Sequence, residues 1–426
     1  MNICSYHLQE AGATPEQELA YALATAISVL DELKTRVPNG EFPELCGRLS
    51  FFVNAGIRFV TEMCKMRAFV DLWDEILIER YGIENPKFRR FRYGVQVNSL
   101  GLTEQQPENN VYRILIEMLA VTLSKKARAR AVQLPAWNEA LGLPRPWDQQ
   151  WSMRMQQIMA FETDLLEYED LFDGNSVVDT KVEALKTSAR YELKTIESQG
   201  GALESIDYMK SRLVESNTLR LQNIESKQTT VVGVNKYINT EESPLVSGDG
   251  GIMVVDPLVE KDQIDRLNKW RASRNQTTVE NALNNLRKAA LAGKNIMPAS
   301  IEAAKAGATT GEWAQEMRNI YGEYRGPTGV AAGISNQTEG LDEIRSAVDA
   351  VSDKLGERLK FLIGKPGLDG HSNGAEQIAS RARDCGMKIE YEGSRLTPQE
   401  LVDTVKTSKA HVIGLSILSG SHIPLV

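Results

Sequence analysis

The stretch RLKFLIGKPGLDGHSNGAEQIASRARDCG, residues 358–386, predicts one strand–loop–helix unit of an α/β fold. Its beginning, Arg358–Gly364, is largely apolar and predicts a strand, whereas Asn373–Cys385 predicts a helix that ends at Gly386. The glycine-rich segment Lys365–Gly374 joins the two elements. Because ligands of open α/β sheets bind beside loops that follow the strands, this segment is the first candidate site.

Two more predicted strands extend this unit. Lys388–Tyr391 and His411–Leu418 are strand-like, and the capping sequence Thr397–Glu400 begins a helix between them. The resulting βαβαβ order is typical of a doubly wound parallel sheet. The sequence given stops at Val426, so we expect residues 357–426 to form an incomplete domain of this kind.

The first half of the chain repeats the same alternation. A strand predicted at Asn2–Tyr6 precedes a helix whose first residues, Thr14–Gln17, form a capping box with proline at the first helical position. Three further strand and helix pairs follow, at 49–53 with 57–81, 93–97 with 107–126, and 130–134 with 148–172. Such alternation predicts parallel strands covered by helices. Four units are half of a (β/α)8 barrel, so residues 1–174 predict half of a TIM-type barrel.

Polar residues recur at the ends of these predicted strands. His7, Ser50, Gln96 and Glu139 follow one another at nearly equal intervals. In a (β/α) barrel the side chains that take part in chemistry lie at the carboxyl ends of the strands and face one mouth. We therefore expect these four side chains to face a common cavity, although Ser50 could simply end a strand and Glu139 could cap a helix.

The remaining parts are predicted to connect the two α/β regions. Residues 175–328 are mostly charged amphipathic helix, interrupted near 229–252 by a stretch with Gly, Ser and Pro, and predict a helical scaffold or connecting region. Residues 329–356 have the composition of an interdomain linker.

Composition and charge exclude several functions. With 42% hydrophobic and 25% charged residues the chain is typical of a soluble globular protein, and its net charge of -8 disfavours a nucleic-acid partner. The basic clusters Lys87–Arg92 and Lys125–Arg130 fit solvated rims better than base-stacking surfaces. No apolar run predicts a membrane span or a signal peptide. Four cysteines without Cys-x-x-Cys spacing indicate a reducing, cytoplasmic setting.

His371 is the candidate metal ligand of the segment Lys365–Gly374. A neutral imidazole nitrogen can bind a transition metal, and Asp369 can hold the proton of the other nitrogen. Gly374 allows a bulky ligand to approach the backbone. Taken alone, a histidine in a loop is more often an ordinary surface residue.

This segment, together with Ser416-Ile417-Leu418, resembles the cobalamin-binding signature of the methylmalonyl-CoA mutase family, although the later Gly-Gly element of that signature is absent. The resemblance implies a flavodoxin-like cobalamin-binding domain in which His371 binds the cobalt of adenosylcobalamin. Asp369 and Lys365 would tune the histidine, and Ser416 would contact the nucleotide tail. The implied cofactor-binding residues of this domain are Lys365, Asp369, His371, Gly374, Ser416 and Leu418.

The resemblance extends through the first half. Asn2–Thr14 is similar to the active-site strand and loop of the family. This similarity implies that Tyr6 and His7 are catalytic residues and that His7 donates a hydrogen bond to the substrate thioester carbonyl. Arg48 and Ser50 match residues that contact the coenzyme A arm. Gln96 matches a family residue that lines the substrate cavity, and Glu139 matches one that holds the deoxyadenosyl ribose.

Departures from the family pattern indicate a branch within it. Gln96–Thr103 and Ala136–Glu139 look like the ethylmalonyl-CoA mutases, and Pro135 replaces a family asparagine near the adenosyl group. The implied activity is an isomerase that interconverts ethylmalonyl-CoA and methylsuccinyl-CoA by radical carbon-skeleton rearrangement. The alternatives are a methylmalonyl-CoA mutase, a cobalamin-binding carrier or sensor, and an inactive fragment.

The resemblance also implies an acyl-CoA substrate and a homodimer for the full-length protein. The sequence given begins inside a family strand, so the first half of the barrel is expected to lie outside it. Without that half, the predicted strand Asn2–Tyr6 would have backbone groups without partners at a buried edge. We therefore expect poor solubility and no turnover for this segment by itself.

Overall fold

The computed structural model describes residues 1–239, 241–246, 251–254, 256–323, 341–367 and 373–417. It divides into two compact units, one made of Met1–Met253 with Pro327–Val426 and the other of Val254–Gly326. The fold is mixed α/β, with parallel sheets and many helices. The domain boundaries predicted at residues 174, 328 and 356 stay predictions.

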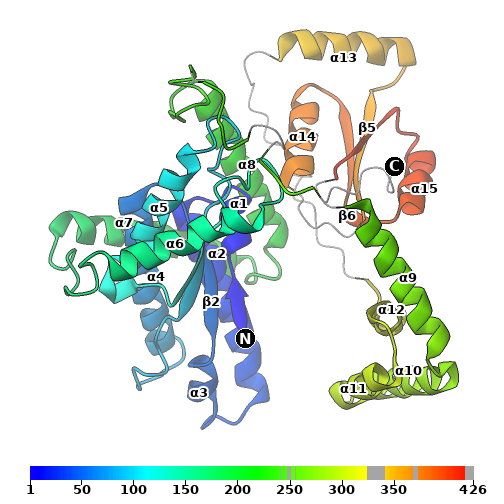
Figure 1. The fold of residues 1–426 in the computed structure, drawn as a ribbon, viewed down its shortest axis with the longest axis horizontal. Helices are drawn as coiled ribbons and strands as arrows, with labels where there is room; N and C mark the ends of the chain where they lie inside the picture. The colour runs from blue at the N-terminus through cyan, green and yellow to red at the C-terminus, as the bar shows by residue number, and fades with distance from the viewer. Residues whose placement is uncertain (240, 247–250, 255, 324–340, 368–372, 418–426) are drawn as a thin grey trace. The chain divides into compact units, whose positions relative to one another are not determined.

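The first half of the chain forms a parallel sheet with strand order β1-β2-β3-β4 (Figure 1). Its strands are β1 Asn2–Cys4, β2 Ser50–Ala55, β3 Tyr93–Val97 and β4 Ala131–Gln133. All three pairings are parallel, with Cys4 opposite Phe52 and Asn54 opposite Gln96. The prediction of four parallel strands is therefore confirmed, and the bounds of β3 agree with it residue for residue.

Helices cover one face of this sheet. They are α2 Pro15–Arg36, α4 Phe59–Glu79 and α5 Asn109–Thr122, and α7 Ser176–Ser198 packs on α2 and α4. The strand residues that point toward them are fully buried among helix side chains, for example Phe51 against Trp73 at 5.0 Å between ring centroids. The predicted capping box of α2 is confirmed, since Thr14 Oγ1 accepts from the Gln17 amide and Gln17 Oε1 accepts from the Thr14 amide.

The other face of the sheet is largely uncovered. Alternate residues point to opposite sides of a strand, and those opposite the helices are exposed or half-buried. The register aligns them in rows across the strands. Asn54 is the exception, since it is buried beneath the short helix α1 Tyr6–Glu10. We call this the open face; it comprises Asn2, Cys4, Ser50, Phe52, Gly94, Gln96, Ala131 and Gln133.

Several predicted element bounds were wrong: the strand predicted at Lys388–Tyr391 continues to Leu396, and two elements in the first half of the chain also differ. The strand predicted to include Tyr6 ends at Cys4, because the buried Ser5 hydroxyl donates to Glu18 and the chain turns into α1. The helix predicted over 148–172 is α6 Pro146–Phe161, since the carboxylate of Asp170 binds the Lys126 amide and the Ser124 hydroxyl in a folded-back loop.

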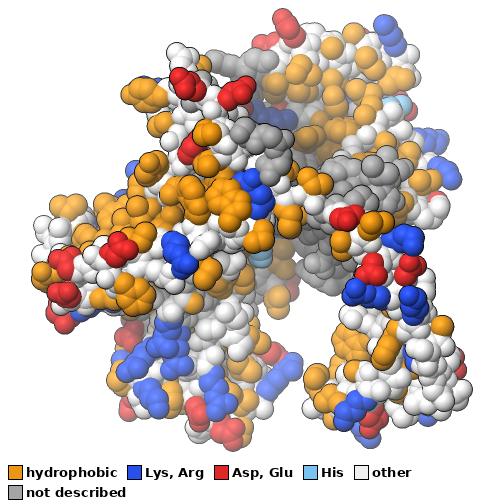
Figure 2. Space-filling model, viewed as in Figure 1, with side chains coloured by type: hydrophobic (Ala, Val, Ile, Leu, Met, Phe, Trp, Pro, Cys, Tyr) orange, Lys and Arg blue, Asp and Glu red, His pale blue; other side chains and the backbone are white. Residues whose placement is uncertain are grey.

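Helix α6 carries apolar side chains on two sides. Met155 and Met159 pack against the cluster formed around Leu134 and Ile114. Figure 2 shows further hydrophobic side chains gathered over this helix, and they include the exposed residues Trp147, Trp151, Met153, Ile158 and Phe161. Exposed apolar area of this kind favours association in water.

The last part forms a second parallel sheet with strand order β6-β5-β7. Its elements are α13 Asp342–Leu355, β5 Lys360–Pro366, α14 Asn373–Asp384, β6 Lys388–Leu396, α15 Pro398–Ser408 and β7 Val412–Leu415. Ile363 packs with α14, whereas its neighbour Leu362 packs with Leu401 of α15. Because consecutive residues point to opposite faces, the two helices cover opposite sides of this sheet, as in doubly wound folds.

The other helical segments complete the description. In the first unit they are α3 Phe42–Cys46, the 3-10 turn η1 Lys125–Ala127 and α8 Ile206–Glu225. The unit Val254–Gly326 consists of α9 Pro257–Ser273, α10 Gln276–Leu291, α11 Met297–Ala306 and α12 Thr310–Tyr321. Arg274 and Glu312 form a two-bond ion pair within it. Across the described parts of the chain, no helix combines the length and apolar character needed to cross a membrane.

Candidate functional site

Three of the predicted site residues meet at the carboxyl edge of the four-stranded sheet. Gln96 Nε2 donates to the hydroxyl oxygen of Tyr6 at 2.9 Å. The imidazole of His7 lies against the Tyr6 ring edge-on, with 4.8 Å between ring centroids. Tyr6 is half-buried and His7 is exposed, so the pair presents a phenol and an imidazole at this edge.

A carboxylate that sequence reasoning missed lies beside them. Glu10 Oε1 accepts from Asn54 Nδ2 at 3.2 Å and from the amide and hydroxyl of Ser99 at 3.1 and 3.3 Å. Glu10 and Tyr6 are four residues apart on α1, so they share one face of that helix. The edge of the sheet therefore combines an amide, a phenol and a carboxylate within one hydrogen-bonded group.

The charges of this group affect one another. Burial raises the pKa of the Tyr6 hydroxyl, and the carboxylates of Glu10 and Glu139 raise it further, while a hydrogen bond with Ser99 opposes the change. Burial also raises the pKa of Glu139. The nearby charge of Glu10 raises it further, whereas a hydrogen bond with Ser99 lowers it. Glu139 thus lies near Tyr6 and Ser99. The group can bind carbonyl and hydroxyl oxygens through several hydrogen bonds.

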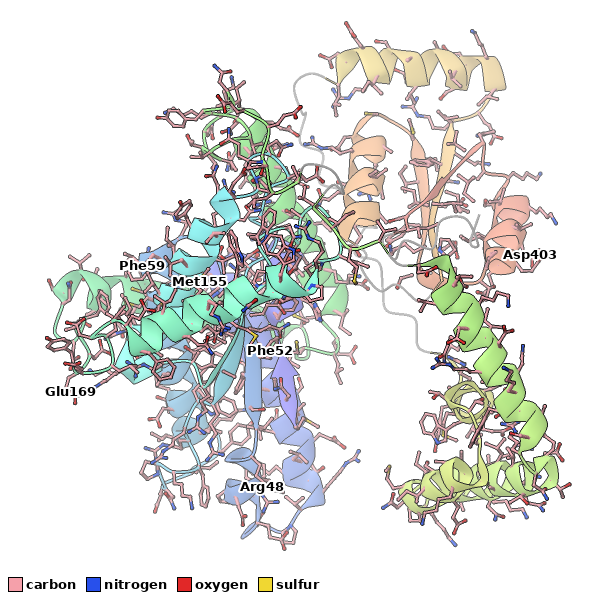
Figure 3. All side chains as sticks on the ribbon, viewed as in Figure 1. Arg48, Phe52, Phe59, Met155, Glu169 and Asp403 are labelled. Carbon is pink, nitrogen blue, oxygen red and sulfur yellow. The ribbon has the colours of Figure 1, made fainter. Side chains whose placement is uncertain are left out.

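Arg48 and Ser50 lie at the other end of the sheet. Ser50 begins β2 and its hydroxyl accepts from Asn2 Nδ2 at 3.2 Å. Arg48 is exposed and pairs with Glu44 of α3 at 2.6 Å. Figure 3 shows Arg48 beside α3 and Phe52 further along β2. The structure therefore separates Ser50 from Tyr6 and Gln96, although Ser50 and Gln96 both belong to the open face.

The second candidate site is at the carboxyl edge of the three-stranded sheet. Lys365 is fully buried near the end of β5, and its Nζ donates to the backbone oxygen and the hydroxyl of Ser416 at 3.1 and 3.2 Å. These bonds join the end of β5 to the segment that follows the adjacent strand β7. Asp369, His371 and Leu418 lie outside the described residues. Within the described ranges, no group of three or more His, Cys, Asp or Glu side chains is placed to hold a metal ion.

The start of α14 lies at the same edge. Among the described residues, a side chain added at Gly374 would meet no atom within 4 Å. By contrast, one added at Gly364, inside β5, would lie 2.1 Å from Leu401. The open position at Gly374 and the buried ammonium of Lys365 fit a bulky, polar cofactor held at the end of the sheet.

Glu10, Ser99 and Asn54 are the residues that sequence reasoning missed. A signal existed for Glu10, because it follows Tyr6 by one helical turn, but it was hidden by the prediction of a strand through Tyr6. Asn54 gave no such signal. Its role depends on contacts with α1, which is distant in sequence.

A buried carboxyl group behind this edge gives a testable pH dependence. Burial, with repulsion from Glu62 and Glu10, raises the pKa of Glu117 from 4.5 to about 9, while Arg113 opposes the shift. The folded state therefore keeps a proton that the unfolded state loses. We expect the free energy of unfolding to fall as pH rises from about 4.5 to 9, by at most about 1.4 kcal/mol per pH unit from this group.

Replacing Glu117 by Gln should remove this slope and make the protein more stable than wild type at pH 9. Urea unfolding followed at several pH values measures the effect. Glu104→Gln, at an exposed position, is the matched control and should keep the wild-type slope. An identical slope in wild type and Glu117→Gln would contradict the prediction.

Comparison with known proteins identifies the class. The family model described as methylmalonyl-CoA mutase matches residues 1–323. The chain therefore belongs to the methylmalonyl-CoA mutase family, and the resemblance inferred from its motifs is confirmed.

The similar proteins fall into two groups. Ethylmalonyl-CoA mutase of Cereibacter sphaeroides is 73% identical over 426 residues, and that of Methylorubrum extorquens is 61% identical over 431. Methylmalonyl-CoA mutase of Escherichia coli is 31% identical over 438 residues. The alignments cover 100% of this chain but only 65%, 62% and 60% of these three relatives, respectively. Higher identity to the ethylmalonyl enzymes agrees with the motif departures around Gln96.

Proposed function

We propose that the protein containing this chain is an adenosylcobalamin-dependent isomerase that interconverts ethylmalonyl-CoA and methylsuccinyl-CoA. The observation that carries the proposal is the open face, which has a polar group at each end. Family membership and 73% and 61% identity to two ethylmalonyl-CoA mutases support the same reaction.

The open face suits an extended acyl-CoA. Ser50 and Asn54 are four positions apart on β2, and Gln96 lies opposite Asn54. At about 3.3 Å per residue, the two ends of the face are about 13 Å apart along the strands. A coenzyme A arm lying along the strands would pass Arg48 and Ser50 and bring its acyl end to Tyr6 and Gln96.

The residues at the carboxyl edge have matching roles. His7, exposed beside Tyr6, would donate a hydrogen bond to the thioester carbonyl and stabilise charge that develops on its oxygen. Tyr6 is oriented by Gln96 and would fix the acyl group beside it. Glu139 would accept hydrogen bonds from the ribose of the deoxyadenosyl group.

The second sheet would hold the cofactor. When bound, adenosylcobalamin supplies the radical that starts the rearrangement, by homolysis of its cobalt–carbon bond. His371 would bind the cobalt, with Asp369 and Lys365 fixing the imidazole. The bond from Lys365 to Ser416 would keep the segment after β5 next to the one after β7, where the nucleotide tail would bind.

These roles imply a division of the chain. Residues 1–174 would be the C-terminal half of a substrate-binding barrel and 357–426 an incomplete cobalamin-binding domain. Residues 175–328 and 329–356 would be the connecting region and the linker. The open face of the four-stranded sheet supports the barrel, because strands that line a barrel interior carry side chains on that face without helices over them.

Turnover of two substrates tests the proposal. The protein should be produced with the sequence that its gene encodes on both sides of this chain, and supplied with adenosylcobalamin. We expect kcat/KM for ethylmalonyl-CoA to exceed that for methylmalonyl-CoA by at least about tenfold, the usual effect of one methylene in a pocket. Turnover of methylmalonyl-CoA alone would favour the second candidate, a methylmalonyl-CoA mutase.

A further inference from the structure

Helix α1 is too short to hold its own position. It has one turn, Tyr6–Glu10, and short helices are unstable in water without tertiary contacts. Yet it carries three residues of the candidate site, Tyr6, His7 and Glu10. Contacts from elsewhere in the fold must therefore fix it on the sheet.

Buried side chains provide these contacts at both ends of the helix. The hydroxyl of Ser5, the residue before α1, donates to Glu18 Oε1 at 3.0 Å. Near the end of α1, Gln9 Nε2 donates to Glu62 Oε1 at 3.2 Å. Ser5, Gln9, Glu18 and Glu62 are all buried. The helix is thus attached to two carboxylates, one from α2 and one from α4.

Lys65 of α4 lies between these carboxylates and is fully buried. Its Nζ donates to Glu18 Oε2 at 2.5 Å, to the backbone oxygen of Asn54 at 2.8 Å and to Gln9 Oε1 at 3.2 Å. These three bonds use all the protons of an ammonium group. Glu62 Oε2, at 2.6 Å, completes the ion pairing.

A buried ammonium is costly unless it is paired and hydrogen-bonded. Burial lowers the pKa of Lys65, but Glu18 and Glu62 outweigh this and raise it, so the side chain keeps its charge. Each of its bonds ends on α1 or on a group that holds α1. Glu18 also accepts from the Asn54 amide, and Asn54 in turn donates to Glu10.

We propose that Lys65 is a positioning residue that sets the placement of Tyr6, His7 and Glu10 by holding α1 through Gln9, Glu18 and Asn54. It lies behind the site and touches no substrate in this scheme. The expected effect on catalysis rests on the proposed function. The expected effect on the position of α1 does not.

The consequence follows from geometry. A displacement of about 1 Å at reacting groups can cost about a hundredfold in rate. Removing the ammonium leaves the buried carboxylates of Glu18 and Glu62 without a countercharge. Their mutual repulsion would displace α1 from its position on the sheet. Arg48 and Ser50, at the far end of the sheet, bond to Glu44 and Asn2 rather than to Lys65 or its partners, so binding of the coenzyme A arm should change little.

The test compares Lys65→Met with Lys186→Met in the holoenzyme. Lys186 is a matched control, since it is also buried and paired with carboxylates, Glu75 at 2.9 Å and Glu183 at 2.8 Å, but on α7. We expect Lys65→Met to lower kcat about a hundredfold with KM for the acyl-CoA nearly unchanged. Lys186→Met should keep the wild-type kcat.

A second readout does not depend on activity. Fluorotyrosine incorporated into the protein gives a fluorine NMR signal for Tyr6, and loss of that signal in Tyr6→Phe assigns it. The chemical shift of this signal depends on the neighbouring rings of His7 and Phe52. This signal should shift or broaden in Lys65→Met and not in Lys186→Met. Wild-type kcat and an unmoved signal in Lys65→Met would overturn the inference. If wild type itself turns over no acyl-CoA, the proposed function fails and the fluorine signal still decides the placement.

A double variant covers the case in which Lys65→Met does not fold. Ser5→Ala with Gln9→Met removes the two attachments of α1 that end on Glu18, Glu62 and Lys65, and leaves only those from Asn54, while Lys65 stays paired with Glu18 and Glu62. We expect the same loss of kcat and the same change in the Tyr6 signal. Wild-type values for this double variant would show that α1 does not depend on the network.

Discussion

Replacing His371 by Ala is expected to remove cofactor binding and turnover together. The imidazole is the proposed cobalt ligand, and loss of a residue that only supports such a ligand already costs about 10 to 100-fold in affinity. We expect the affinity for adenosylcobalamin to fall by at least about a hundredfold, and the absorption changes that accompany imidazole binding to disappear. Titration of the complete protein with adenosylcobalamin, followed by absorption spectroscopy, measures both.

His411 provides the control for this experiment. It belongs to the same domain but lies before β7, at the opposite end of the sheet, where its Nδ1 accepts from the Lys360 amide at 3.0 Å. His411→Ala should therefore bind the cofactor as wild type does. Equal affinity, spectrum and turnover for wild type and His371→Ala would require a different cobalt ligand or a different function.

Replacing His7 by Ala is expected to lower kcat by about 100 to 1,000-fold, the usual effect of removing one donor that stabilises developing negative charge. KM should change much less, because the proposed contacts with the coenzyme A arm lie at the amino end of the open face. Steady-state kinetics with saturating adenosylcobalamin measure both constants.

His7→Gln is the informative partner of that variant, since an amide can still donate a hydrogen bond. It should recover part of the lost kcat if His7 acts as a donor. A rise in KM with unchanged kcat in His7→Ala would instead assign His7 to substrate binding. Both variants replace an exposed side chain, so little effect on folding is expected.

The alternation of strands and helices was predictable because each element has its own local pattern. Strands such as Tyr93–Val97 alternate buried and half-buried residues, and α2 begins with a capping box. Parallel pairing follows from that order, since each helix returns the chain to the same end of the sheet. The register and the open face then follow from the two-residue period of the strands.

The details of the site were less predictable because they depend on distant residues. Nothing local near Tyr6 indicates a helix, and α1 forms because Glu18, Asn54 and Lys65 bind its ends. Sequence patterns report periodic elements, whereas a single turn held by tertiary contacts has no period to detect. For the same reason Glu10 was missed, although its position beside Tyr6 is simple once the helix is known.

The open face also determines the thiol chemistry of the protein. Cys4 is exposed and lies on that face opposite Phe52, whereas Cys46, Cys64 and Cys385 are buried. Among the four cysteines of this chain, a maleimide or spin label would therefore react selectively at Cys4. Burial also raises the pKa of the other three thiols, which keeps them unreactive at neutral pH. The fold of this chain thus places one reactive thiol on the face where we propose the substrate lies.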